Sequence, residues 1–381
     1  MPTAPDGSVQ RAQTSRPASA EAQPRPAQRR LRHLGWQVGL TYQAATPAGV
    51  DRDHLLRLLD EMAAHGMNTL SLMMQSYGYF DPGHDGYAWP PQNPKLQPYR
   101  DPAALNAQPG TEFLRGIVDA AALRGIVIHL FLNWGIWNPA KIAAHYPDAT
   151  LQHAPNAAPA GWLHCPDSPG AWQLGLDEVS DLLSFHLHPN VTSYAFERIS
   201  YQCEDRCHCP HTQRAFLAAT GVTMRAASPP QIEAWKQERI GGHLQKYTAH
   251  IRRIRPDITI GLHTQCAPGW GHDPSRLKRD GIDYLLPHTI QFPTTQRELY
   301  ATLERLAPNP CVLHFCTRDR RPANYDLWIK TPAIIDEALR WVEDYPGDNL
   351  AGILFFNEPA TSPVNKQAVY RAIRRFTCSE T

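Results

Sequence analysis

The sequence predicts an α/β protein, a closed (β/α)8 barrel of the TIM type with long loops after its second and third strands. Three observations lead to this prediction. Eight short apolar runs alternate along the chain with stretches of helical periodicity. The runs are almost continuously apolar, as expected for parallel strands that are buried on both faces. No glycine-rich phosphate-binding turn follows the first run, which disfavours the alternative of an open doubly wound sheet.

Each predicted strand is an apolar run that ends in polar or aromatic residues. In chain order, the eight runs are 35–43, 67–77, 126–137, 191–201, 257–265, 282–290, 310–319 and 351–359. The stretches between them place apolar residues three or four positions apart, and the first of these stops at Gly66, as helices often do. The expected helices cover 51–66, 111–125, 229–255, 273–280, 295–306, 331–345 and 363–376.

Composition fits one globular barrel and argues against several other classes of protein. The 381 residues are enough for a single barrel with extended loops. A formal net charge of +1 predicts no nucleic-acid partner and no membrane attraction. Residues 1–33 are rich in Pro, Ala, Gln and Arg and lack the apolar core of a secretory signal. We therefore expect a disordered tail over 1–33, a single catalytic barrel over 34–381, and a cytoplasmic location.

Polar side chains gather at the carboxyl ends of the predicted strands. In (β/α)8 barrels these ends form the active site. Amide, imidazole and aromatic side chains suit a polyhydroxylated substrate, because they offer hydrogen bonds and flat apolar faces. His314 lies in the middle of its run and is predicted to be a core residue whose hydrogen bonds are satisfied. The residues predicted to bind substrate are Gln75, Asn133, Trp134, Arg198, Tyr201, His263, His288, Asp319 and Asn357.

Two of the predicted strands finish with a glutamate. Glu197 follows SYAF, and Glu358 follows ILFFN. A carboxylate in such a place is partly desolvated, so its pKa can be tuned for acid or base catalysis. Two carboxylates that face each other across a sugar are the minimum for hydrolysing a glycoside, so we predict Glu197 and Glu358 as the catalytic pair. The alternative is that each is half of a buried ion pair with Arg198 or Arg318.

The stretch FERISYQCEDRCHCPHTQRAFLAATG, residues 196–221, resembles the segment after strand four in family 42 β-galactosidases and related uncharacterised glycoside hydrolase-like barrels. In that family, an acidic residue ends the strand, a cysteine-rich loop follows, and a Phe-bearing helix closes at a glycine. The resemblance implies a glycoside hydrolase barrel that is often trimeric and has Glu197 as a catalytic carboxylate. The corresponding positions here are Glu197, Cys207, Cys209, Phe216 and Gly221.

This sequence departs from the family pattern in two places. The third loop cysteine would fall at Thr212, and His211 stands one position earlier. The nucleophile of the family is a glutamate on strand seven, but the seventh run here, CVLHFCTRD, has none. The pairing of Glu197 with Glu358 is therefore an inference from strand ends and not from the resemblance.

The cysteine-rich loop offers ligands for zinc, which prefers four thiolate or imidazole donors in a tetrahedron. Cys203, Cys207, Cys209 and His211 supply four donors within nine residues, and Cys165 could replace one of them. The resemblance implies a structural zinc away from the chemistry. Free thiols or one strained disulfide are the alternatives.

Three functions follow from these features. The favoured one is hydrolysis of a glycosidic bond in a small saccharide or glycoside, with no cofactor needed for the chemistry. A non-catalytic carbohydrate-binding barrel would explain the missing glutamate of strand seven. A metal-dependent hydrolase would use His263 and His288 with Glu358. The aromatic loop 76–94 is expected to cover the site, its Tyr and Trp side chains either binding sugar or packing the loop.

Overall fold

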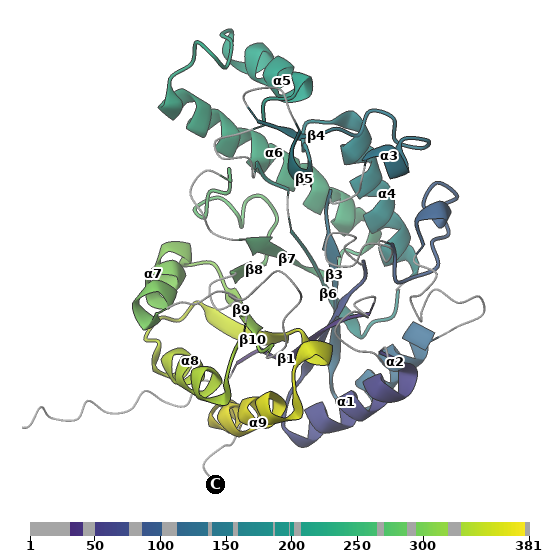
Figure 1. Cartoon of the computed structure of the whole chain (residues 1–381), viewed down its shortest axis with the longest axis vertical. Coiled ribbons are helices and arrows are strands. Elements are labelled where there is room, and N and C mark those ends of the chain that lie inside the picture. The colour runs from purple at the N-terminus through teal and green to yellow at the C-terminus, as the bar shows by residue number, and fades with distance from the viewer. Residues whose placement is uncertain are drawn as a thin grey trace, which may run out of the picture.

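Eight parallel strands close into a barrel surrounded by helices in the computed structural model (Figure 1). The predicted (β/α)8 barrel is therefore confirmed. The structure describes residues 31–40, 50–75, 86–100, 113–135, 139–154, 159–185, 187–197, 199–201, 207–264, 270–287, 295–318 and 329–377.

Each of the eight predicted runs overlaps one barrel strand, although β1 and β10 begin before their predicted runs. The hydrogen-bonded order β1-β10-β9-β8-β7-β6-β3-β2 closes on itself, because β1 pairs in parallel with both β10 and β2. The strands are β1 (His33–Gly39), β2 (Thr69–Met73), β3 (Val127–Asn133), β6 (Val191–Glu197), β7 (Thr259–Thr264), β8 (Tyr284–Pro287), β9 (Cys311–Cys316) and β10 (Leu350–Phe356).

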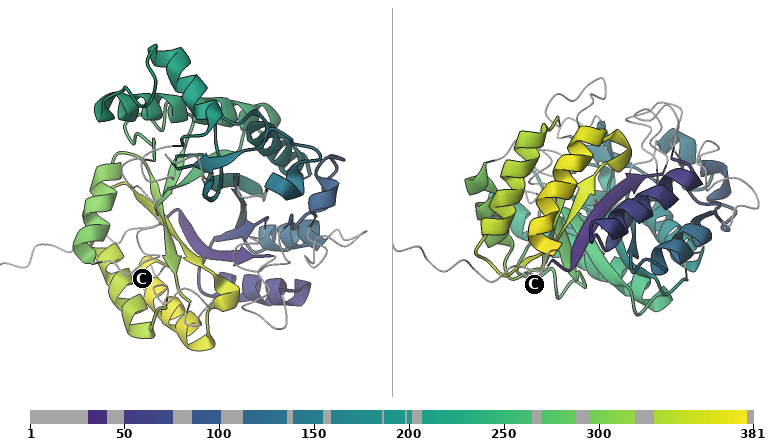
Figure 2. Two further views of the ribbon diagram at one scale, coloured as in Figure 1. Left: turned by 45° about the horizontal axis from the view of Figure 1, so that its top comes forward. Right: turned by 90° about the horizontal axis from the view of Figure 1, so that it is seen from below.

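Helices surround the barrel, as the views in Figure 2 show. The α-helices are α1 (Arg52–Ala64), α2 (Phe113–Ala122), α3 (Pro139–Ile142), α4 (Pro169–Phe185), α5 (Pro210–Thr220), α6 (Pro229–Ile254), α7 (Gln296–Leu306), α8 (Pro332–Asp344) and α9 (Pro363–Thr377). Two short 3-10 helices are η1 (Gln97–Tyr99) and η5 (Glu358–Ala360). No described helix is long and apolar enough to cross a membrane.

One predicted helix is wrong. Residues 273–280 form turns, and the Asp273 carboxylate accepts a hydrogen bond from the Ser275 backbone N–H at 2.9 Å. A side chain that bonds its own backbone in this way competes with the helix. The other six predicted helices are found as α1, α2, α6, α7, α8 and α9.

Two connections at the carboxyl ends of the strands are elaborate. Between β3 and β6 the chain forms α3, an antiparallel hairpin of β4 (Leu151–His153) and β5 (Pro159–His164), and α4. Between β6 and β7 it forms α5 and the long α6. In Figure 1 these elements group at one end of the molecule, opposite α8 and α9. As the resemblance implies, α5 carries a buried Phe216 and ends at Gly221, whose φ of 74° favours glycine.

The barrel interior is apolar in its middle and polar at its carboxyl end. Because side chains alternate along a strand, every second residue points inward. The apolar inward residues form a cluster of their own: Met73, Phe131, Ala195, Tyr284, Leu286, Val312, Leu354 and Phe356. Two positions further along three of these strands lie Asn133, Glu197 and His314, all buried. The alternation therefore brings two predicted site residues, Asn133 and Glu197, together with His314 into one layer above the core.

Candidate active site

Glu197 ends β6 and points into the polar layer of the barrel. Its side chain is 4% exposed. It stands between Asn133 of β3 and His263 of β7 in the strand register. Its Oε2 is hydrogen-bonded to His263 Nδ1. The predicted catalytic carboxylate is thus desolvated and held by an imidazole, which is a setting suited to proton transfer.

The contact with Glu197 begins a longer hydrogen-bonded array. His263 Nε2 lies 2.9 Å from His314 Nδ1, and His314 Nε2 contacts Gln37 Oε1. Gln37 Nε2 donates to Ser71 Oγ at 3.2 Å. These five residues, which we call the Glu197 array, come from β6, β7, β9, β1 and β2 and cross the barrel. His314 is buried with both ring nitrogens hydrogen-bonded, as expected of a satisfied core residue, and these bonds also link it to Glu197 through His263.

Alternation along the strands was the one sequence signal for the rest of the array. His314 and Gln37 point inward as Glu197 does, but each lies two residues before the end of its strand. Both ring nitrogens of His263 are engaged in the array. This arrangement does not favour the prediction that His263 donates to sugar hydroxyls, which stays a prediction.

Glu358, the other predicted catalytic carboxylate, lies in a different environment. It belongs to η5, just after β10, and is fully buried. Its Oε2 lies 2.8 Å from His54 Nε2 of α1, and its Oε1 contacts Lys366 Nζ of α9. Burial alone would raise the pKa of this carboxyl, but the hydrogen bond from His54 and the charge of Lys366 lower it. These contacts favour the ion-pair alternative, although the partners are His54 and Lys366 and not an arginine.

Several other predicted site residues have structural contacts. Trp134 packs on α4, where a Cβ added at Gly175 would lie 2.1 Å from its Nε1. Asn357 Oδ1 accepts a hydrogen bond from the Gly39 N–H at 3.2 Å. Gln75 is buried and bridges to Tyr87. Arg198, His288 and Asp319 lie outside the described residues, so their roles remain predictions.

The described part of the aromatic loop packs against α4. Tyr87 donates to Glu178 at 2.8 Å, and Trp89 Nε1 donates to Asp181 at 2.7 Å. Both aromatic side chains are fully buried. For these two residues the structure supports loop packing and not a sugar platform.

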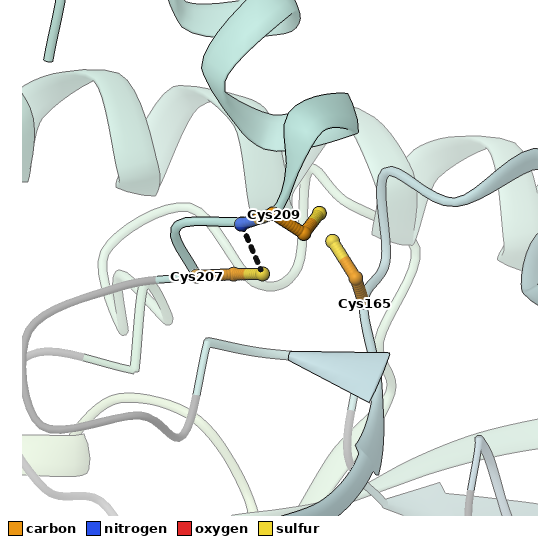
Figure 3. A group of neighbouring side chains, drawn as sticks. All are labelled: Cys165, Cys207 and Cys209. Atoms are coloured by element: carbon orange, nitrogen blue, oxygen red, sulfur yellow. Dashed lines mark hydrogen bonds between the residues drawn. The ribbon is translucent and has the colours of Figure 1, made fainter. Parts of the chain in front are cut away.

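Three cysteines come together beside the barrel (Figure 3). The sulfur atoms of Cys165, Cys207 and Cys209 all lie within 4.8 Å of one another. His211 is not among them, because its Nδ1 contacts the Arg214 guanidinium at 3.0 Å on the exposed side of α5. The structure therefore groups Cys165, the alternative ligand, with Cys207 and Cys209, and this geometry does not favour His211, whose role as a ligand stays a prediction. Cys203 lies outside the described residues.

The cysteine group has features of a thiolate site. Backbone N–H groups of Asp167 and His153 point at Cys165 Sγ and Cys207 Sγ, at 3.4 and 3.3 Å. Hydrogen bonds from the neighbouring Cys165 and Cys207 thiols lower the pKa of Cys209, whereas burial raises the pKa of Cys165. Against the opposing hydrogen bond of Cys165, the hydrogen bond to Cys209 together with burial raises the pKa of Cys207 to about 12. Converging sulfur atoms with N–H donors around them are the donor set that zinc selects. The described residues therefore fit three of the four ligands of a structural zinc.

A buried brace that the sequence did not reveal lies next to the cysteines. Asp167 accepts hydrogen bonds from Tyr201 OH at 2.6 Å, Arg239 Nε at 2.6 Å and His243 Nε2 at 3.0 Å. Burial opposes ionisation, but these three donors hold the pKa of Asp167 well below its usual range. Tyr201, predicted to bind substrate, is thus fixed to the cysteine loop and to α6. The only sequence signal was the position of Asp167 two residues after Cys165.

Comparisons with known proteins find similarity in structure alone. No protein-family model matches the sequence, and no curated protein matches it significantly. The glycoside hydrolase domain of PgaB (BpsB) from Bordetella bronchiseptica has a TM-score of 0.65 and 14% identity, and the match covers 92% of this chain and 100% of that domain. A β-galactosidase from Halorubrum lacusprofundi has a TM-score of 0.64 and 11% identity, covering 91% of this chain and 58% of that one.

A family 42 β-galactosidase from G. stearothermophilus is also similar, with a TM-score of 0.57 and 14% identity over 91% of this chain. This chain spans 58% and 56% of the two β-galactosidase chains. Such low identities establish a shared fold. The protein described here is a (β/α)8 barrel with the fold that these glycoside hydrolase structures share.

Proposed function

We propose that this protein is a glycoside hydrolase in which Glu197 is the catalytic acid and base. The observation that carries the proposal is the buried Glu197 carboxyl at the carboxyl end of the fourth barrel strand, bonded to His263. A carboxyl group at this position can give a proton to the oxygen of a leaving group, and the His263 imidazole beside it can exchange a proton with it. The fold neighbours that are named glycoside hydrolases support the same reaction class.

The second carboxylate of the reaction is less well defined. Glu358 was predicted for this role, but its contacts with His54 and Lys366 favour a structural one. Asp319 follows the seventh barrel strand, where the family 42 nucleophile stands, and lies outside the described residues. We propose a small saccharide or glycoside as substrate, because amide groups such as that of Asn133 line the polar layer beside Glu197.

The direct test is a panel of glycosides assayed with wild type and Glu197→Gln. General acid–base catalysis contributes about 10²- to 10⁴-fold, so kcat/KM should fall by that factor while the unfolding temperature stays close to wild type. Glu304→Gln, at an exposed glutamate of α7, is the matched control and should keep full activity. Full activity of Glu197→Gln would remove Glu197 from the chemistry. Saccharide binding without turnover by wild type would instead support the non-catalytic barrel.

The same assay decides the role of Glu358. If Glu358→Gln hydrolyses glycosides normally at a temperature where it is folded, Glu358 is not the second carboxylate. If the folded variant is inactive, the original pairing of Glu197 with Glu358 stands. Loss of activity on chelation, with retained fold, would favour a metal-dependent hydrolase.

We also propose that Cys165, Cys207 and Cys209 hold a structural zinc with a fourth ligand from the neighbouring loop. The bound ion would brace the connection that follows β6. Elemental analysis of the purified protein should find one zinc per chain, and Cys207→Ser should lower that content. A metal-free protein with titratable thiols would establish the free-thiol alternative.

A further inference from the structure

The hydrogen bonds of the Glu197 array must all point the same way along it, because a histidine that donates at one contact accepts at the other. A neutral imidazole has one N–H and one acceptor nitrogen, so a histidine that uses both nitrogens donates on one side and accepts on the other. His263 and His314 are both engaged on both nitrogens. The donor at one end of the array therefore determines which atom donates at every other contact, up to the far end.

The orientation of the Gln37 amide sets the direction of these hydrogen bonds. Its Nε2 donates to Ser71 Oγ, so its Oε1 faces His314 and can only accept. His314 Nε2 must then carry a hydrogen, which leaves Nδ1 as an acceptor for His263 Nε2–H. His263 Nδ1 in turn accepts, so the contact with Glu197 requires a proton of its own. In this arrangement the Glu197–His263 pair holds one proton more than a carboxylate beside a neutral histidine.

Rotating the Gln37 amide by about 180° reverses every bond. Gln37 Nε2 would then donate to His314 Nε2, His314 Nδ1–H to His263 Nε2, and His263 Nδ1–H to a Glu197 carboxylate. This arrangement contains one proton fewer, the one that Glu197 has given away. The Ser71 hydroxyl can either accept or donate, so it tolerates both orientations.

We propose that Gln37 is a positioning residue whose amide orientation is coupled, through His314 and His263, to the presence of the proton on Glu197. This inference rests on the proposed function, in which Glu197 alternates between acid and base. The proton leaves Glu197 for the oxygen of the leaving group and returns from the attacking water, so the carboxyl passes through both states in each turnover. The array then offers a complete set of hydrogen bonds to each state.

The surroundings of the array are mostly apolar. The Phe131 ring meets His263 edge-on at 5.4 Å, and Phe356 lies 4.7 Å from the His314 ring. Among the described residues, two charged groups lie on this side: Arg318, with its guanidinium carbon 4.5 Å from the Phe356 ring, and the buried Lys330, whose charge acts on Cys316. On β9, burial raises the pKa of the Cys316 thiol, which is therefore neutral at ordinary pH. Arg318 opposes an added proton, while the hydrogen bonds of the array favour it.

The test is ¹⁵N NMR of the full chain labelled at histidine, which reports which ring nitrogen carries hydrogen. His263→Gln and His314→Gln assign the two signals. In wild type, both histidines should be Nε2–H at low pH and should change together to Nδ1–H at one midpoint. Separate midpoints, or unchanged tautomers between about pH 4 and 9, would overturn the coupling.

Two variants of Gln37 complete the experiment. Gln37→Glu can only accept and adds negative charge, so the shared midpoint should rise by about one pH unit or more. Gln37→Met is similar in size but has no group to set the direction, so His314 should populate both tautomers. An unchanged midpoint in Gln37→Glu would contradict the proposal. These signals do not depend on glycoside turnover, so an inactive protein with coupled tautomers would refute the proposed function alone.

Discussion

The ends of β6 and β10 show how the same sequence pattern serves two different roles. Both strands finish an apolar run with a buried glutamate. Glu197 points into the barrel, where it is hydrogen-bonded to His263, which is in turn hydrogen-bonded to His314. Glu358 belongs to η5 and contacts His54 of α1 and Lys366 of α9, the helices that flank β1 and β10 on the outside.

The difference lies in the partners and not in burial. Glu358 is paired with a cation, which stabilises its ionised form and lowers its pKa. Such a carboxylate is a poor proton donor near neutral pH. Glu197 is held by an array of groups that can accept or donate, so its proton can leave and return. A carboxyl group suited to catalysis and one suited to an ion pair can therefore follow the same kind of strand.

The largest expected effect on stability is that of Glu358→Gln. Removing the charge leaves Lys366 without its buried anion, and breaking a buried pair from one side costs about 3 kcal/mol or more. Urea denaturation at neutral pH should show this loss, while Glu197→Gln should lose much less, because its amide N–H can still donate to His263. Equal losses of unfolding free energy in the two variants would show that Glu358 and Glu197 do not differ in their contribution to stability.

The fold was predictable because it depends on patterns within short segments. Eight apolar runs and their helical connections follow from local periodicity, and each run overlaps a barrel strand. The helix α4 and the β4–β5 hairpin were not predicted, because they depend on packing against segments that are distant in the sequence. The turn at Asp273 was mistaken for a helix because a side-chain bond to the backbone at Ser275 outweighs the apolar spacing.

The site was predictable only in part, for a related reason. Side chains along β6 point alternately into and out of the barrel, and this alternation places Glu197 inside. After β10 the 3-10 helix η5 interrupts the alternation, so it could not predict the position of Glu358. The partners Gln37 and His314 come from strands 277 residues apart in the chain. No local pattern records such a contact. The cysteine group likewise needed Cys165, which the fold brings to the loop from before α4.

A smaller effect is expected from Lys366→Met. The substitution keeps the apolar part of the side chain and leaves Glu358 with His54, whose ring can still donate a hydrogen bond. We expect a loss of about 2–3 kcal/mol, because a buried carboxylate that loses its cation costs more than a neutral acceptor, while the remaining hydrogen bond from His54 limits the loss. Combined with Glu358→Gln, the double variant should lose clearly less than the sum of the single variants. Strict additivity would show that the two side chains do not stabilise each other.

The smallest and most specific effect is the dependence of the Glu358 contribution on pH. Because the folded-state pKa of Glu358 lies below its ordinary value of 4.5, its contribution to stability is fully present above about pH 4.5 and is lost as the pH falls through the folded-state pKa. The difference in unfolding free energy between wild type and Glu358→Gln should therefore be constant from neutral pH down to mildly acidic pH and shrink below it. Asp167 also has a lowered pKa, so wild type alone would lose stability in acid for two reasons, and only the difference isolates Glu358. A difference that grows as the pH falls would mean that Glu358 is protonated in the native protein, and the contrast with Glu197 would then disappear.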